Sequence, residues 1–312
     1  MPVALICGSL AYDTIMVFPD QFKNHILPDK VHILNVSFLV PRMRREFGGC
    51  AGNIAYNLKL LGGAPMPMAT VGQDFGPYRE HFQAQGIPLD HVKEIEDLYT
   101  AQAFITTDLD DNQITAFHPG AMMRSYENHV KDVPDVAFGI VGPDGYEAML
   151  QNSSEFAESG IPFIFDPGQA MPLYNGKELT RMIEQATYVT VNDYESNLLQ
   201  DKTGLTEKQI AERVQAYLIT RGPKGSEVHT RDGMLQVPAA TAMRVVDPTG
   251  CGDAYRAGLI YGWMNGMDMA TTGRIASLMG ALKIEHLGPQ NQRFDFEHFA
   301  EQFRQQFGYA LR

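Results

Sequence analysis

Cysteine is scarce in this sequence: Cys7, Cys50 and Cys251 are the three found among 312 residues. They lie in apolar or glycine-rich stretches and lack the close spacing of zinc ligands, so the pattern favours neither a cysteine metal site nor a disulfide framework. Reduced thiols are the expected state, which predicts a protein of the cytoplasm.

Positive charge is also in short supply, with 25 lysines and arginines against 37 aspartates and glutamates and a net charge of −12. This balance argues against a broad contact with nucleic acid or with an anionic membrane, although a local basic pocket could still hold a phosphate. No apolar run reaches the roughly 18 residues of a membrane span. The opening MPVALICGSL lacks the basic segment of a signal peptide and is read as a first strand.

The chain is long enough for a large core, and its second half has a regular pattern. From about residue 136, short apolar stretches alternate with helical ones near 146–159, 177–186, 193–200 and 206–216. This alternation predicts βαβ units and a mostly parallel sheet flanked by helices. The predicted strands are VAFGIVG, PFIFDPG, TYVTVND and AYLITRG, followed by a hairpin that turns at Asp232-Gly233 and by helices near 252–265, 270–284 and 295–307.

The first half is richer in strands. VALICGSL predicts a buried strand, NIAYNLKLLG a helix, and TAQAFITTDLDDNQITAFHPG two strands joined by an acidic turn. Because no linker is evident, we expect a single domain over 1–312, with the pieces at about 14–48 and 90–118 as excursions from it.

VHILNVSFLV alternates and predicts a further strand, with an apolar face made by Leu34, Val36, Phe38 and Val40. A sheet one layer thick cannot bury both of its faces, so this strip predicts a homodimer; packing against the chain's own helices is the alternative.

The stretch DPTGCGDAYRAG, residues 247–258, has small side chains or none at positions 249–252, just before an apolar helix. Glycine admits a ligand close to the backbone, and a helix N-terminus adds unpaired N–H donors, so Gly250, Cys251 and Gly252 suit an anion. Asp253 would repel a static phosphate but makes sense as the acceptor of a proton from an attacking hydroxyl. The alternative is an ordinary helix start, with Thr249 as cap and Asp253 favoured by the dipole.

FGGCAGN, residues 47–53, is a second glycine-rich entry to a helix and is not a Walker A loop. Asn53 could hydrogen-bond a polyol, and Asp13, just beyond the first strand, suits two sugar hydroxyls; a tight turn and a solvated aspartate are the alternatives.

Two further stretches, VTVNDYE (residues 189–195) and ITRGPKG (residues 219–225), each lie at the end of a predicted strand. In the first, Asn192 and Glu195 suit a hydrated Mg²⁺, but their spacing is also that of a capping box. In the second, Gly222, Gly225 and the cations Arg221 and Lys224 suit a nucleotide's phosphates, and a plain turn is equally compatible.

DPTGCGDAYRAG and GGCAGN, in this order and spacing, resemble the signatures of the ribokinase-like (PfkB) family of sugar and nucleoside kinases, over essentially the whole chain. GSLAYDTIMVFPDQF, SFLV, AFHPGAM, NDYE and GPKG look most like the bacterial adenosine kinases of the mycobacterial type. The resemblance implies an α/β three-layer sandwich with a small β-sheet lid. It further implies transfer of the γ-phosphate of ATP to the 5′-hydroxyl of adenosine, giving AMP for purine salvage. A broader purine-nucleoside kinase and a free-sugar kinase are the alternatives.

Matching positions imply roles for individual residues. Asp253 is implied as the catalytic base, with the amides of Gly250, Cys251 and Gly252 as the anion hole. The implied substrate residues are Asp13, Gly49 and Asn53 for the ribose, and Ser9, Ser37 and Phe117 for the rest of the nucleoside. For ATP and Mg²⁺ they are Asn192, Glu195, Thr220, Gly222 and Gly225. Asp247 and Thr249 match positions that bind a monovalent cation such as K⁺ in some relatives.

Two positions depart from the family pattern. Cys251 stands where alanine or valine is usual, and the backbone role survives this change. Ala103 stands where a purine-stacking phenylalanine is expected, with Phe104 one residue later. A shift of one residue in a strand turns the side chain to the other face, so the resemblance specifies the reaction more strongly than the base.

Overall fold

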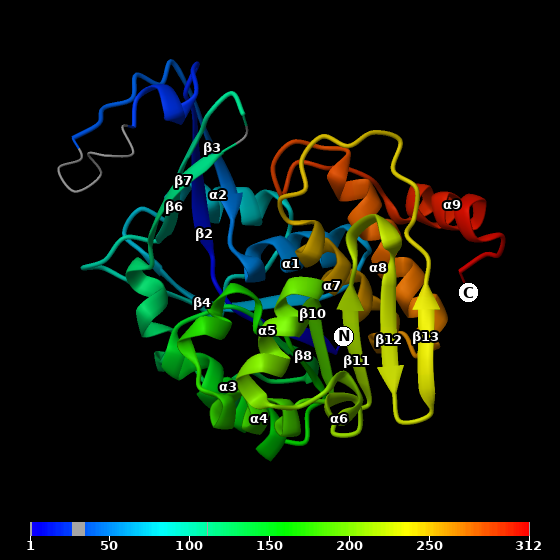
Figure 1. The fold of residues 1–312 in the computed structure, drawn as a ribbon. Helices are drawn as coiled ribbons and strands as arrows, with labels where there is room; N and C mark the ends of the chain where they lie inside the picture. The colour runs from blue at the N-terminus through cyan, green and yellow to red at the C-terminus, as the bar shows by residue number, and fades with distance from the viewer. Residues whose placement is uncertain (1, 27–34, 111, 312) are drawn as a thin grey trace.

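The computed structural model describes residues 2–26, 35–110 and 112–311. A nine-stranded sheet forms the body of the molecule, and helices cover both of its faces (Figure 1). Neighbouring strands are parallel except for the β11–β12 and β12–β13 pairs, so the predicted, mostly parallel α/β sheet is confirmed. In spatial order its strands are β13 (Gly233–Val237), β12 (Ser226–Thr230), β11 (Ala216–Thr220), β10 (Tyr188–Asn192), β9 (Phe163–Phe165), β8 (Val136–Val141), β1 (Val3–Cys7), β4 (Pro65–Gly72) and β5 (Val92–Ile95).

Alternation along β1 sends side chains into two separate cores, one on each face of the sheet. Ala4 and Ile6 belong to one buried cluster, whereas Leu5 and Cys7 belong to the other. The first cluster is covered by α1 (Cys50–Leu60), α2 (Gly76–Ala84), α7 (Cys251–Met264) and α8 (Met269–Ile284), with α9 (Phe296–Phe307) packed outside α8. The second is covered by α3 (Tyr146–Glu158), α4 (Gly176–Gln185), α5 (Asp193–Thr203) and α6 (Glu207–Ala211).

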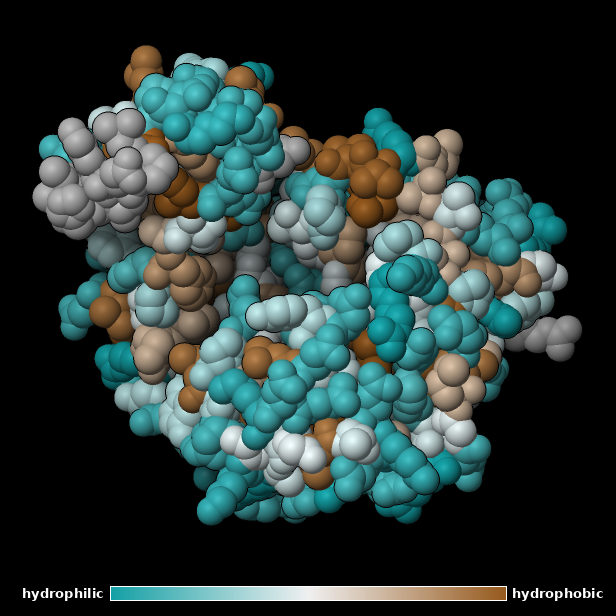
Figure 2. Space-filling model, viewed as in Figure 1, coloured by the Kyte–Doolittle hydropathy of each residue, from teal (hydrophilic) through white to brown (hydrophobic). Residues whose placement is uncertain are grey.

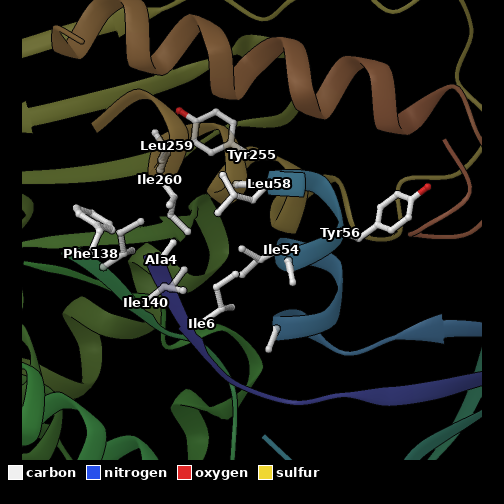
Figure 3. Close-up of a cluster of buried hydrophobic side chains, with 14 of the residues drawn as sticks. Ala4, Ile6, Ile54, Tyr56, Leu58, Phe138, Ile140, Tyr255, Leu259 and Ile260 are labelled. Carbon is white, nitrogen blue, oxygen red and sulfur yellow. The ribbon is translucent and has the colours of Figure 1, made fainter. Parts of the chain in front are cut away.

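Figure 3 shows the first core at the point where it supports the two glycine-rich helix starts. Ile54 and Leu58, four residues apart and so on one face of α1, are completely or almost completely buried against Ile6 of β1. Ile260 of α7 is buried in the same cluster. The two helices are therefore fixed on the sheet by a shared apolar layer, which sets where their N-termini lie.

A separate four-stranded sheet stands off the body beside α1 and α2, at the upper left of Figure 1. It contains the predicted hairpin of strands joined by an acidic turn. Its strands in spatial order are β3 (Arg42–Gly48), β2 (Ala11–Val17), β6 (Ala101–Thr107) and β7 (Gln113–His118). These strands differ from the predicted excursions at two places, since β2 begins before residue 14 and β5 pairs with β4 in the large sheet. The assignment of residues 1–312 to one domain stays a prediction.

The strand predicted from VHILNVSFLV is wrong where the structure describes it, because residues 35–40 are irregular. Their alternating burial has another cause: the Phe38 ring packs on those of Phe18 and Phe22, at centroid distances of 4.8 and 5.1 Å. The short 3-10 helix η1 (Phe22–Asn24) supplies one of these rings. Leu34 lies outside the described residues.

One helix is shorter than the pattern predicts, and two elements lie outside the predicted set. α6 ends at Ala211 although helical spacing continues to residue 216, since the chain must turn there to enter β11. β4 and α2 were not predicted. Among the described residues, no helix combines the length and the apolar character needed to cross a bilayer.

Candidate active site

Several polar residues lie at the carboxyl ends of the strands in the large sheet, among them the predicted site residues Ser9, Asn192 and Thr220. Ser9 follows β1, Asp166 follows β9, Asn192 ends β10 and Thr220 ends β11. Figure 2 shows the surface hollowed between the small sheet and the body. Ligands of open α/β sheets bind outside this edge.

A cavity of about 560 Å³ lies elsewhere, lined in part by Phe138, Tyr188 and Trp263. It opens at the amino ends of β8, β9 and β10, the opposite edge of the sheet from the Asp253 carboxylate. We therefore place the candidate active site in the hollow and not in this cavity.

The N-terminus of α7 offers free donors to the hollow. Gly250 precedes the helix with a φ of 79°, and a Cβ there would lie 2.7 Å from Cβ of Pro289, so glycine is required. Within the part of the chain that the structure describes, the amides of Gly250, Gly252 and Asp253 have no acceptor. The Cys251 amide, also expected in the anion hole, instead donates to the Pro248 carbonyl at 3.1 Å. Its backbone is used to close the turn.

Asp253 lies in the first turn of α7, beside these amides. Asn53 Nδ2 donates to Asp253 Oδ2 at 2.8 Å. Desolvation raises the pKa of Asp253 to about 7, while the Asn53 hydrogen bond and the Arg256 charge oppose the rise. A carboxyl with this pKa exchanges a proton readily near neutral pH, which suits a general base.

Asn53 is itself held in one orientation. Its Oδ1 accepts a hydrogen bond of 2.9 Å from Gln290 Nε2, which also donates to the Tyr78 hydroxyl at 2.7 Å. Because Oδ1 is the acceptor here, Nδ2 is the group left to face Asp253. The sequence reasoning missed Gln290, since its contact with Asn53 spans 237 positions of the chain.

Two glycines allow β2, β3 and α1 to meet closely around Asp13. A Cβ at Gly48 would lie 2.4 Å from Asp13 Oδ2, and one at Gly49, where φ is 84°, would lie 2.5 Å from the Ser9 carbonyl. Ser9 Oγ accepts a hydrogen bond of 3.2 Å from the Cys50 amide. Desolvation, followed by the charges of Glu46 and Asp247, raises the pKa of Asp13 to about 6. The structure therefore brings Ser9, Asp13, Gly49, Asn53 and Asp253 to one place.

The register of the small sheet decides which aromatic side chain shares a face with Asp13. Asp13 pairs with Ala103, and Ala103 pairs with Phe117, so these side chains point to one face. Phe104 pairs with Thr14 and points to the other face. Phe104 therefore does not take the place of the phenylalanine expected at Ala103.

Ser37 lies exposed in irregular chain. Its predicted part in the nucleoside pocket stays a prediction.

Asp166 and Arg256 form a buried ion pair next to Asp253. Arg256 Nε donates to Asp166 Oδ2 at 2.7 Å, and Nη2 donates to Oδ1 at 2.9 Å. The sequence holds a signal for this pair, because Asp166 directly follows a buried strand and Arg256 interrupts an apolar helix, but neither residue was predicted in the site.

Asn192 and Glu195 form a capping box at the start of α5. Asn192 Oδ1 accepts from the Glu195 amide, and Glu195 Oε2 accepts from the Asn192 amide, both at 2.8 Å. Desolvation, followed by the Asp166 charge, raises the pKa of the Glu195 carboxyl.

The turn after β11 is shaped by glycines. Gly225 has a φ of 87°, and a Cβ there would lie 2.1 Å from the Val237 carbonyl; Gly222 has a φ of 54° and open space beside it. Thr220 pairs with Asn192 across the strands. Arg221 is bound to Glu227 at 2.7 Å, which leaves Lys224 as the exposed cation of this turn.

Asp247 and Thr249 lie just before the anion hole. The Asp247 carboxylate accepts hydrogen bonds of 2.9 Å from the Thr249 and Gly288 amides. Its main-chain oxygen accepts one of 2.8 Å from Lys283 Nζ. Among the described residues, no group of three His, Cys, Asp or Glu side chains is arranged to hold a metal ion.

The chain is similar in sequence and in structure to known nucleoside kinases. A curated nucleoside kinase from Methanothermobacter thermautotrophicus is 32% identical over an alignment of 319 positions that covers 98% of this chain and 96% of the relative. A solved structure of the Burkholderia thailandensis nucleoside kinase in complex with inosine is 56% identical, with a TM-score of 0.91 over 98% of this chain and 99% of that one. The same kinase in complex with ADP-inosine is 57% identical, with a TM-score of 0.88 over 98% and 97%.

The pattern of the pfkB family of carbohydrate kinases matches residues 12–294. The ribokinase-like resemblance is thereby confirmed, as is the ribokinase-like fold; the closer likeness to mycobacterial adenosine kinases stays a prediction. Since the match covers nearly the whole chain and includes both glycine-rich helix starts, this chain belongs to the pfkB family of carbohydrate kinases.

Proposed function

We propose that this chain transfers the γ-phosphate of ATP to the 5′-hydroxyl of a purine nucleoside, adenosine among them, and so forms the nucleoside monophosphate. The observation that carries the proposal is the position of Asp253. Its carboxylate lies beside the amides of Gly250 and Gly252, which have no acceptor among the described residues, and is held by Asn53 at 2.8 Å. A proton acceptor and an anion site are thus joined in one helix turn.

In the proposed reaction, Asp253 accepts the proton of the 5′-hydroxyl as its oxygen attacks the γ-phosphorus and the bond to the β-phosphate oxygen breaks. The amides of Gly250 and Gly252, together with the positive end of the α7 dipole, stabilise the charge on the transferring phosphoryl group. Phosphoryl transfer depends chiefly on such positioning and electrostatic stabilisation.

The small sheet supplies the groups that would recognise the nucleoside. Asp13 and Asn53 offer a carboxylate and an amide for the ribose hydroxyls. Phe117 shares the face of Asp13 and is about half exposed, at 49%, so its ring is free to stack on a base. Ser9 and Gly49 shape the floor under the ribose, and Ser37 is proposed for the pocket on the family pattern alone.

The nucleotide would lie over the ends of β10 and β11. Thr220, Gly222 and Gly225 would contact ATP, and Lys224 is an exposed cation for its phosphates. Asn192 and Glu195 provide hard oxygen donors of the kind that hydrated Mg²⁺ prefers, next to the carboxylate of Asp166. When bound with ATP, Mg²⁺ would neutralise charge between the β- and γ-phosphates.

A broad preference among purine nucleosides has a specific observation in its favour. The Burkholderia thailandensis relative, 56% identical, was solved with inosine, whose base has an oxygen where adenosine has an amino group. In this chain Ala103 leaves the base with less aromatic contact than a phenylalanine would give. We therefore include inosine with adenosine among the proposed substrates.

The test is a set of initial rates of ATP-dependent phosphorylation with adenosine, inosine, guanosine, cytidine, ribose and fructose. We expect the purine nucleosides to exceed ribose in kcat/KM by at least about tenfold, because stacking of a base on an aromatic ring contributes ~1–3 kcal/mol in nucleic-acid sites. If ribose were phosphorylated as efficiently as adenosine, the chain would be a free-sugar kinase. Activity on adenosine with none on inosine would restrict the substrate to adenosine.

A further inference from the structure

Lys283 on α8 is fully buried, a rare situation for a lysine. Its ammonium donates to two main-chain oxygens, that of Asp247 at 2.8 Å and that of His286 at 3.1 Å. A buried charge is costly unless it is paired and hydrogen-bonded. The buried ammonium therefore links the segment before α7, at Asp247, to the segment after α8, at His286.

The Asp247 carboxylate joins the same two segments. One of its oxygens accepts from the Thr249 amide and the other from the Gly288 amide. Each of the three Asp247 oxygens therefore accepts a hydrogen bond, the two carboxylate oxygens from amides and the main-chain oxygen from the Lys283 ammonium.

Both joined segments reach the proposed active site. Gly250, whose amide faces the hollow, comes directly after the first segment and lies against Pro289 of the second. The next residue, Gln290, orients Asn53 toward Asp253. A shift of either segment would therefore move the anion hole, the Asn53 amide or both.

These contacts do not fit the monovalent cation expected at Asp247 and Thr249. The Asp247 carbonyl, an oxygen that a K⁺ ion at this position could use as a ligand, already accepts from an ammonium, and a second positive charge a few ångströms away would be repelled. We propose that Lys283 is a positioning residue whose ammonium takes the place of a bound monovalent cation, so that neither folding nor catalysis in this chain requires K⁺.

The wild-type protein provides the first test. Its thermal midpoint and its initial rate with ATP and adenosine would be measured in K⁺, Na⁺, NH₄⁺ and the bulky cation N-methylglucamine, at one ionic strength. We expect one midpoint in all four, and rates within about twofold of one another, because a cation without a site shifts no equilibrium. A higher midpoint or a several-fold higher rate in K⁺ would overturn the proposal. The rate arm rests on the proposed function, but the midpoint arm does not.

Two variants then separate the charge from the volume of the side chain. Lys283→Ala leaves room for a small cation, whereas Lys283→Met fills most of that room without charge. We expect both to lose kcat by at least about tenfold, since displacement of a reacting group by 1 Å can cost about 10²-fold. NH₄⁺ or K⁺ should restore part of the loss, and part of the thermal midpoint, in Lys283→Ala alone.

Lys208→Ala is the matched control, because its side chain is 87% exposed, and it should show no response to any cation. A Lys283→Ala variant with wild-type kcat and midpoint would contradict the positioning role. If neither Lys283 variant folds, the wild-type series alone still decides the proposal.

Discussion

The amide of Asn53 is fixed from both ends, by Gln290 at Oδ1 and by Asp253 at Nδ2. This arrangement makes Gln290 a positioning residue, although it touches no reacting group in the proposed mechanism. Its two donated bonds and the contact of its Oε1 with His81 at 3.0 Å leave the side-chain amide fully used.

Gln290→Ala should lower kcat/KM by about tenfold or more, because misplacement by 1 Å can cost about 10²-fold. It should also lower the free energy of unfolding by ~1–3 kcal/mol, since buried polar partners lose their hydrogen bond. Steady-state kinetics and urea unfolding measure the two effects.

Gln292→Ala is the matched control. Gln292 is equally buried but donates to Asn57 Oδ1 at 2.7 Å instead of to the side chain of Asn53. It should lose similar stability and keep most of its kcat/KM. Equal losses of kcat/KM in the two variants would show that Gln290 acts only through stability.

At the scale of elements, α7 is tied to the sheet by a charged pair as well as by its apolar face. The Asp166–Arg256 pair joins the first turns of α7 to the end of β9 and is almost fully buried. Breaking such a pair leaves an uncompensated buried charge, which typically costs ~3–5 kcal/mol.

Arg256→Met should therefore lower the free energy of unfolding by ~3–5 kcal/mol, whereas the double change Arg256→Met with Asp166→Leu should recover much of the loss. Denaturant unfolding of the two variants and of the wild type measures this. A single variant that loses less than about 1 kcal/mol, the range of an exposed pair, would mean that the ion pair is solvated in solution.

Elements with a strong local pattern could be predicted, and those fixed by distant partners could not. The βαβ half and the hairpin after β11 follow from periodicity and turn residues, and the structure confirms both elements. The turn itself lies at Arg231 and Asp232, one residue before the predicted Asp232-Gly233, because Gly233 already pairs with Thr230. Residues 35–40 alternate like a strand but pair with no strand that the structure describes, and their burial comes from Phe38 packing on Phe18. In the site, motifs identified Asp253 and Asn53, but Gln290 and Lys283 meet them only through the fold.

At the scale of the whole molecule, the small sheet exposes part of one face, although Tyr12 and Phe47 on that face pack on Tyr78 of α2. Met43, Phe104 and Ile114 are 68%, 40% and 44% exposed, and register places them on the face opposite Asp13. Phe38, expected in the apolar strip, instead packs on its own chain. The face of Met43, Phe104 and Ile114 is now the better basis for the proposed homodimer.

Light scattering at micromolar concentration should give twice the chain mass for the wild type, because exposed apolar patches on a monomer favour association. Phe104→Glu should give the monomer mass, since it places a charge in the proposed interface. Tyr194→Glu, at a residue that is 72% exposed on the helix α5, is the control and should stay dimeric. A monomer mass for the wild type would remove the dimer.

The charge state of Asp253 links the function of the molecule to its stability. Its pKa is raised from 3.8 to about 7 by desolvation, so between about pH 4 and 7 the folded state binds more protons than the unfolded state. Stability from this group is therefore present at low pH and is lost as the pH rises through 7. The catalytic base form, in contrast, is gained over the same range, so kcat/KM should fall as the pH drops below about 7.

The most direct measurement is kcat of Asp253→Asn at pH 8, taken together with its thermal midpoint and with Asp295→Asn, the cap of α9, as the control. We predict a fall in kcat of ~10²–10⁴, the usual contribution of a general base. The thermal midpoint should stay the same or rise, because a desolvated carboxylate is removed while Asn53 keeps an acceptor. A variant with near-normal kcat and a lower midpoint would contradict the proposed base and would leave Asp253 as a helix-capping charge.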